Sequence, residues 1–134
     1  MVDSLQRSDS EPPNPFIQIE RSLSGDRVDV DTAIQALLLL ANEAGIVRMT
    51  TLEAGHLHVE VGDCGFAQVN VDRAKMKIRM VCARLAVLCK EQGAQDLSPY
   101  GGRGSLSHSG FDHPFDLDFA NTMHEQSILL ATHT

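Results

Sequence analysis

Two stretches of the chain carry apolar residues at the spacing of an amphipathic helix. In residues 30–41 and 72–92, apolar side chains recur every three or four positions, which aligns them on one face of a helix. Asp29 or Asp31 is placed to cap the first helix and Asp72 the second, and a glycine follows each of them. The pattern therefore predicts two main helices, each with a buried face.

Between and after these helices, apolar and polar residues alternate with the period of a half-buried strand. The predicted strands are residues 46–52, 57–61, 67–71, 115–119 and 128–131. The second and third are expected to pair as a hairpin, and so are the last two. An alternative for the C-terminal segment is a helix, because Thr122 and Glu125 have the spacing of a capping box.

Three further segments carry weaker signals. Residues 1–15 are polar, rich in serine and interrupted by prolines, which predicts a disordered tail. Phe16, Ile17 and Ile19 predict a short edge strand or an anchoring segment, and the stretch from there to Asp29 predicts a loop. Residues 94–114, with four glycines, predict a long loop. The expected architecture is one α+β domain over residues 16–134, with an antiparallel sheet of about five strands and both helices packed on one face. The expected order is helix, three strands, helix, long loop and two strands.

The composition limits the possible settings and partners. The chain has 134 residues, of which 43% are hydrophobic and 22% charged, as in an ordinary globular domain. It has five Phe, one Tyr and no Trp, so platforms for stacking nucleic-acid bases are hard to build. No apolar run approaches the roughly 20 residues that span a bilayer, so no membrane association is expected. Three cysteines without a secretory signal predict a reducing cytoplasm, with Cys82 and Cys89 buried and Cys64 exposed at a turn.

The predicted second helix is strongly basic in an acidic chain. Residues 73–91, which follow the capping Asp72, carry six basic side chains against Glu91 and so a charge of +5, whereas the other five basic and 17 acidic residues of the chain sum to −12. Successive residues are 100° apart around a helix. This places Arg73, Lys77 and Arg84 on one border of the buried stripe, and Lys75, Arg79 and Lys90 on the other. Facing away from the core, a second apolar stripe comprises Met76, Met80, Ala83 and Val87.

Two interpretations of this helix stay open. In one, the long basic side chains cover apolar surface and pair with the acidic remainder of the domain. In the other, the stripe binds a protein partner or a second copy of the chain, because Met is frequent at adaptable binding surfaces. The candidate partner-binding residues are then Met76, Met80, Val87, Arg73, Lys77 and Arg84. Nucleic acid is disfavoured as a partner, because the acidic remainder would repel phosphates.

The glycine-rich segment holds the other candidate chemistry. Arg103 lies among glycines and is a candidate anion-binding residue, although no phosphate-loop motif is present. His108, Asp112 and His113 are candidate metal ligands, although they match no recognised ligand spacing. No catalytic constellation and no cofactor motif are found, which argues against an enzyme. We therefore expect a small noncatalytic interaction module, such as an adaptor, regulator or inhibitor. The alternative is a small-molecule- or metal-binding domain, or an enzyme, with a site at residues 98–113.

Overall fold

The computed structural model describes residues 14–51, 56–62, 65–93 and 96–132. Most of the expected N-terminal tail and Cys64 therefore lie outside the described residues. The helices are α2 (Pro15–Leu23), α3 (Val30–Ala44) and α4 (Ala74–Glu91). The strands are β1 (Ile46–Thr51), β2 (His56–Val61), β3 (Phe66–Asn70), β4 (Leu97–Ser98), β5 (Gly101–Leu106), β6 (Phe115–Asn121) and β7 (Gln126–Thr132).

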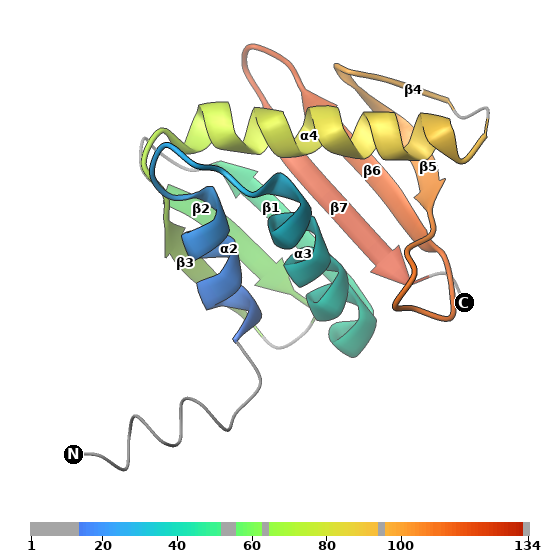
Figure 1. The fold of residues 1–134 in the computed structure, drawn as a ribbon, viewed down its shortest axis with the longest axis horizontal. Coiled ribbons are helices and arrows are strands. Elements are labelled where there is room, and N and C mark those ends of the chain that lie inside the picture. Colours follow the sequence, from blue (N-terminus) through green and yellow to red (C-terminus); the bar gives the residue numbers. More distant parts are fainter. Residues whose placement is uncertain (1–13, 52–55, 63–64, 94–95, 133–134) are drawn as a thin grey trace.

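The strands form one antiparallel sheet, and the described helices lie on one of its faces (Figure 1). The sheet order is β3-β2-β1-β7-β6-β5-β4, so the C-terminal hairpin is inserted beside β1. Helix α4 crosses the sheet in front of β5, β6 and β7, while α2 and α3 lie together over the other half. This confirms the α+β class and the one-sided packing, although the sheet has seven strands rather than about five.

The first helix of the structure, α2, contradicts the expected edge strand or loop. Pro15 is the first helical residue, where its missing N–H costs no helical hydrogen bond. The side chain of Asn14 caps the helix by accepting a hydrogen bond from the amide of Phe16, at 2.9 Å. Ile19 and Leu23, one turn apart, are fully buried against the core. Pro15 thus begins a helix here instead of excluding one.

Helices α3 and α4 follow the sequence pattern but begin differently. Asp29 caps α3, and its carboxylate accepts hydrogen bonds from the amide and the hydroxyl of Thr32. These bonds lower the pKa of Asp29. Asp72, in contrast, does not cap α4, since the N-cap residue is Arg73 in a left-handed conformation with φ of 53° and no side-chain capping bond. The prediction for Asp72 was wrong because its carboxylate is bound elsewhere.

The predicted long loop contains the hairpin of β4 and β5. Gly101 and Gly102 have φ values of +149° and +135°, in a region that side chains rarely adopt. A Cβ on Gly102 would lie 2.5 Å from the carbonyl oxygen of Asp96 and 2.6 Å from Cα of Leu97. Gly102 therefore allows β4 and β5 to approach closely, and a Cβ on Gly101 would lie 2.8 Å from the carbonyl oxygen of Phe119 on β6. These close approaches give the glycine-rich sequence a structural cause.

The C-terminal hairpin of β6 and β7 is present, and the alternative helix is not. The hydroxyl of Thr122 accepts hydrogen bonds from the amides of His124 and Glu125. The residues that resemble a capping box thus close the turn between the strands, which is the other common use of a threonine hydroxyl.

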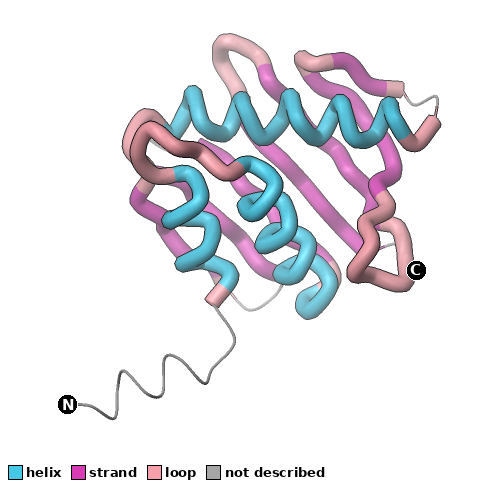
Figure 2. The backbone as a smooth tube through the Cα atoms, in the orientation of Figure 1, coloured by secondary structure: helices cyan, strands magenta, loops and turns pink. Residues whose placement is uncertain are grey.

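The core lies between the sheet and the helices, and the loops connect them around the edge (Figure 2). Buried and less buried residues alternate along the longer inner strands, as for Val47 and Met49 of β1 or Phe115, Leu117 and Phe119 of β6. Within the described ranges, no helix has the length and apolar character needed to cross a membrane.

Candidate functional site: the outer face of helix α4

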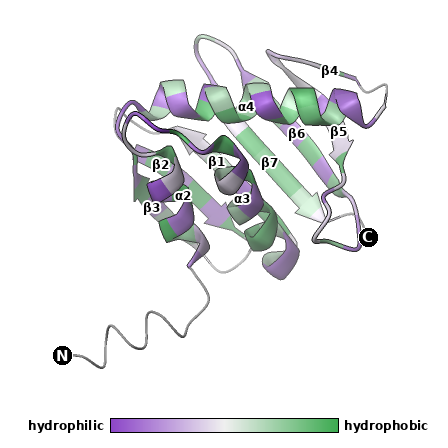
Figure 3. Cartoon of the chain, in the orientation of Figure 1, coloured by the Kyte–Doolittle hydropathy of each residue, from purple (hydrophilic) through white to green (hydrophobic). Residues whose placement is uncertain are grey.

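Helix α4 buries one side and leaves the other uncovered. Ile78 and Leu85 on the inner side are fully buried, as the periodicity predicts. On the opposite side Met76, Met80 and Val87 are 44%, 39% and 46% exposed. Together with the exposed Ala83, these three residues make up the α4 outer face. Hydrophobic and hydrophilic residues follow one another along the visible side of this helix (Figure 3).

An open groove of about 690 Å³ runs along the N-terminal half of this face. Its floor is apolar and includes Ala74, Met76, Met80 and Ala83. Small residues at 74 and 83, next to two flexible methionines, leave room for side chains of another molecule to enter between them. Basic residues and Asn121 form the margins of the groove.

The border of α4 that faces α2 and α3 has its exposed charges neutralised. Arg73 forms an ion pair with Asp26 at 3.3 Å, and Arg84 forms one with Asp31 at 3.0 Å. These side chains are substantially exposed, so each ion pair contributes little to stability. The two ion pairs cancel the positive charge of Arg73 and Arg84 on this side of the α4 outer face.

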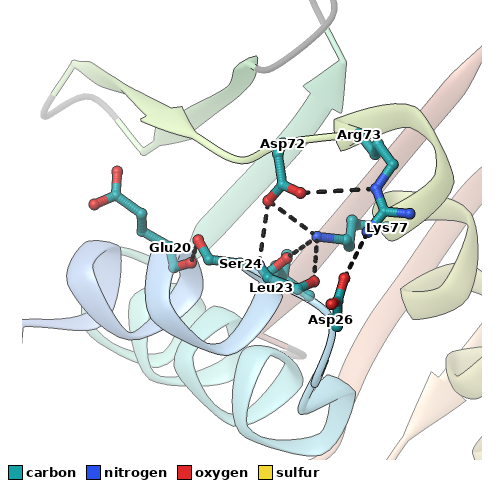
Figure 4. Close-up of polar contacts among 8 residues, drawn as sticks. Glu20, Leu23, Ser24, Asp26, Asp72, Arg73 and Lys77 are labelled. Carbon is teal, nitrogen blue, oxygen red and sulfur yellow. Dashed lines mark hydrogen bonds and ion pairs between the residues drawn. The ribbon is translucent and has the colours of Figure 1, made fainter.

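Lys77 does not belong to the surface, contrary to its selection as a partner-binding candidate. Its side chain is fully buried, and Nζ donates to the carbonyl oxygens of Leu23 at 2.6 Å and Gly25 at 3.1 Å (Figure 4). Nζ also lies 3.2 Å from Oδ1 of Asp72. The lysine thereby joins the end of α2 to the beginning of α4, and it is not accessible to a partner.

Asp72 completes this polar cluster. Its Oδ1 also accepts a hydrogen bond from the amide of Gly25, at 3.2 Å. That bond, followed by the one from Lys77, lowers the pKa of Asp72. The carboxylate is therefore used to hold the α2–α3 connection against α4, which explains why it does not cap the helix.

The opposite border, next to the β6–β7 turn, keeps its positive charge. Lys75 donates from Nζ to the carbonyl oxygen of Met123 at 2.8 Å, and Arg79 donates from Nε to Oδ1 of Asn121 at 3.0 Å. Both acceptors are neutral, so the two cations are oriented without being neutralised. Asn121 is itself buried, and its Nδ2 donates to the carbonyl oxygen of Pro99 at 2.9 Å.

The sequence placed Lys75 and Arg79 on this border but did not select them as candidates, and it missed Asn121 entirely. The role of Asn121 depends on a strand end meeting a helix that is 42 positions away. No local pattern signals such a contact. For the two cations, the available signal was the absence of an acidic residue among their neighbours on α4.

The cysteines on the inner side of α4 are buried as predicted. Cys82 and Cys89 are fully buried free thiols. Burial raises the pKa of Cys82 to about 12, and burial also raises that of Cys89. Both are consequently unreactive packing residues rather than nucleophiles.

Arg103 lies on β5, on the sheet face that the helices leave open. Its Nε donates to Oδ2 of Asp118 on β6, at 3.2 Å. The arginine is thus engaged by a carboxylate on its neighbouring strand. Within the described residues, no hydrogen bond, ion pair or ring contact joins it to His108 or His113.

The candidate metal ligands do not gather into a site. His108 is partly buried, and its ring packs edge-on against Phe111, with the ring centroids 5.8 Å apart. Asp112 and His113 are exposed on the loop before β6. In the part of the chain that the structure describes, no three His, Cys, Asp or Glu side chains are placed to hold a metal ion.

No protein-family model matches the chain, and a search of curated proteins found no match. Any functional assignment for this chain therefore depends on its own geometry.

Proposed function

We propose that this chain is a noncatalytic protein-interaction module that binds an acidic amphipathic helix of another protein along the α4 outer face. The observation that carries the proposal is the row of exposed Met76, Met80 and Val87 beside cations that neutral acceptors hold in place. A reducing cytoplasm is the proposed setting, and it suits the free thiols of Cys82 and Cys89.

A helix is the occupant that suits this surface best. Met76, Met80 and Val87 follow one another at intervals of four and seven, so they form a ridge along the helix axis. Ridges of this kind pack into the grooves of a second helix. Ala83 lies within the ridge and permits the two backbones to approach.

Charge complementarity favours an acidic partner over a second copy of this chain. Lys75 and Arg79 present two positive charges without a carboxylate partner in the described residues. Two copies joined through α4 would bring these like charges together, which is unfavourable. A foreign helix with Asp or Glu beside its apolar stripe would pair with them instead.

The test uses two labelled 18-residue helical peptides with the same leucine stripe, one flanked by Glu and the other by Lys. Fluorescence anisotropy measures their binding to the wild-type protein. We expect the Glu peptide to bind at least about tenfold more tightly, a difference of about 1.4 kcal/mol. Equal binding of the two peptides, or no binding of either, would contradict the proposal.

Variants of the protein locate the binding. Met80→Asp is expected to weaken binding of the Glu peptide at least about tenfold, because it places a carboxylate in the apolar floor. Phe66→Asp is the matched control, since it changes an apolar residue that is 68% exposed on strand β3, away from α4. The double substitution of Lys75→Glu and Arg79→Glu should reverse the preference toward the Lys peptide. Thermal unfolding of each variant verifies that the fold is retained.

A further inference from the structure

Strand β3 ends the sheet with open backbone hydrogen-bonding groups. The amide of Val61 donates to the carbonyl oxygen of Gly65 at 3.0 Å, which fixes the phase of the β2–β3 ladder. Bonded and non-bonded pairs alternate in such a ladder, so the backbone groups of Phe66, Gln68 and Asn70 point away from β2. The amide of Asn70 confirms this direction, since it donates to Oε2 of Glu20 at 3.2 Å.

Apart from Glu20 at the amide of Asn70, the described residues show none of three common protections against strand pairing on this outer edge. Sheet edges are commonly shielded by lysine, proline or a very short strand. The other edge strand, β4, has only two residues. Strand β3 has five residues, and its sequence FAQVN contains no charge and no proline. Within the described residues, the outward amide and carbonyl groups of Phe66 and Gln68 have no partner.

An apolar pocket opens beside this edge, on the side of the helices. Its volume is about 370 Å³, and its lining includes Phe16 of α2, Leu40 and Ala44 of α3, and Ala67 of β3. Side chains of an added strand would alternate between the two sheet faces. The residue opposite Ala67 would therefore direct its side chain into the pocket.

The edge is surrounded by negative charge. Glu43 lines the pocket, Glu20 holds the amide of Asn70, and Glu60 on β2 lies opposite Phe66. None of the residues lining the pocket is a Lys or an Arg. On the outer face, the exposed ring of Phe66 packs against His58, with centroids 4.6 Å apart.

We infer that β3 is a second binding site, which takes an extended peptide as an added strand. The peptide carries an apolar side chain that enters the pocket and a Lys or Arg that pairs with the surrounding carboxylates. Backbone hydrogen bonds supply affinity in this mode of recognition, and the pocket supplies specificity. The site shares no residue with the α4 outer face and stands independently of it.

Two other occupants are less suitable. A second copy would bring its own Glu20, Glu43 and Glu60 to the same edge, so like charges would meet. Its Val69 could not enter the pocket, because that side chain is already buried in its own core. Residues 1–13 of the chain itself carry three acidic residues against one arginine, so the same carboxylates repel them.

The test begins with a linear heptapeptide library displayed on phage and selected on the wild-type protein. Enriched peptides are synthesised, and their affinities are measured by fluorescence anisotropy. We expect them to share an apolar residue and a Lys or Arg, and to lose at least about tenfold in affinity when alternate backbone amides are methylated.

Two variants locate the site. Gln68→Pro removes an outward N–H that is not part of the β2–β3 ladder, and it should lower affinity at least about tenfold. Glu43→Lys changes an exposed residue and keeps the backbone, so it tests the charge requirement even if Gln68→Pro fails to fold. Glu91→Lys, at the end of α4, is its matched control, and Met80→Asp should leave affinity unchanged.

Several results would overturn this inference. They are a failure to enrich any peptide, enriched peptides that bind Gln68→Pro and Glu43→Lys as tightly as wild type, and affinity that is insensitive to backbone methylation. Dimerisation of the wild type that Gln68→Pro abolishes would assign the edge to a second copy. A peptide that binds only after removal of residues 1–13 would assign it to the chain's own N-terminus.

Discussion

The two sides of helix α4 carry similar residue types, which are exposed on one side and buried on the other. Lys75 and Lys77 are two positions apart, yet the first extends over the surface to the β6–β7 turn and the second is buried against the end of α2. Met80 is 39% exposed, whereas Ile78 two positions earlier is fully buried. Residue type therefore does not decide which side chains of this helix are available to a partner.

The neighbouring element decides whether a side chain of α4 is available to a partner. On the inner side, two backbone carbonyls and a carboxylate surround the ammonium group of Lys77 and replace its water. On the outer side, no element of the described structure covers Met76, Met80 and Val87. Substitutions on the inner side should therefore act on stability, and substitutions on the outer side on binding.

The largest expected effect is from Leu85→Ala on the inner side. Removing a fully buried leucine side chain leaves a cavity and lowers the free energy of unfolding by about 3 kcal/mol. Val87→Ala, two residues along on the outer side, should change it by less than about 0.5 kcal/mol. Urea unfolding monitored by circular dichroism measures both, and equal losses would remove the distinction between the two sides.

Lys77→Ala is expected to have the next largest effect on stability. It leaves the carbonyl groups of Leu23 and Gly25 without their donor, and we expect a loss of about 2 kcal/mol in unfolding free energy. Lys75→Ala is the matched control, with an expected change below about 0.5 kcal/mol. Urea unfolding monitored by circular dichroism measures the loss in both variants. A Lys77→Ala protein as stable as Lys75→Ala would show that the buried ammonium group does not hold α2 to α4.

The smallest effect concerns pH. The pKa of Asp72 is lowered in the folded protein, so its carboxylate contributes stability above the unfolded-state value near 3.8. That contribution disappears as pH falls through the lowered folded-state value. Asp72→Asn should therefore lose less stability than wild type between pH 5 and pH 2 in thermal unfolding. Identical pH profiles of the wild type and Asp72→Asn would contradict the role of Asp72.

The parts of the fold that the sequence predicts well are those with a strong period. The apolar stripe of residues 74–89 predicts α4 and its buried cysteines, and alternation predicts β2, β3 and β6. Helix α2 was missed because Asn14 and Pro15 were grouped with the prolines before them, although Asn followed by Pro is also a helix start. Strand β5 was missed because glycines that permit a close backbone crossing resemble the glycines of a flexible loop.

The candidate surface was predictable only in part. Helical spacing alone placed Met76, Met80 and Val87 away from the core, and the structure agrees. The same spacing misjudged Lys77, because the loop that buries it comes from residues 23–25, about 50 positions earlier in the chain. Contacts of that range leave no periodic trace in a sequence.

The most direct measurement of the central claim is an amide ¹H–¹⁵N NMR titration of the protein with the Glu-flanked helical peptide. We predict that the largest shift changes fall between Ala74 and Val87 and at the adjoining Asn121 and Met123, with the reverse face of the sheet unaffected. Changes concentrated on β3, or spread over the open sheet face around Arg48, would contradict binding on the α4 outer face.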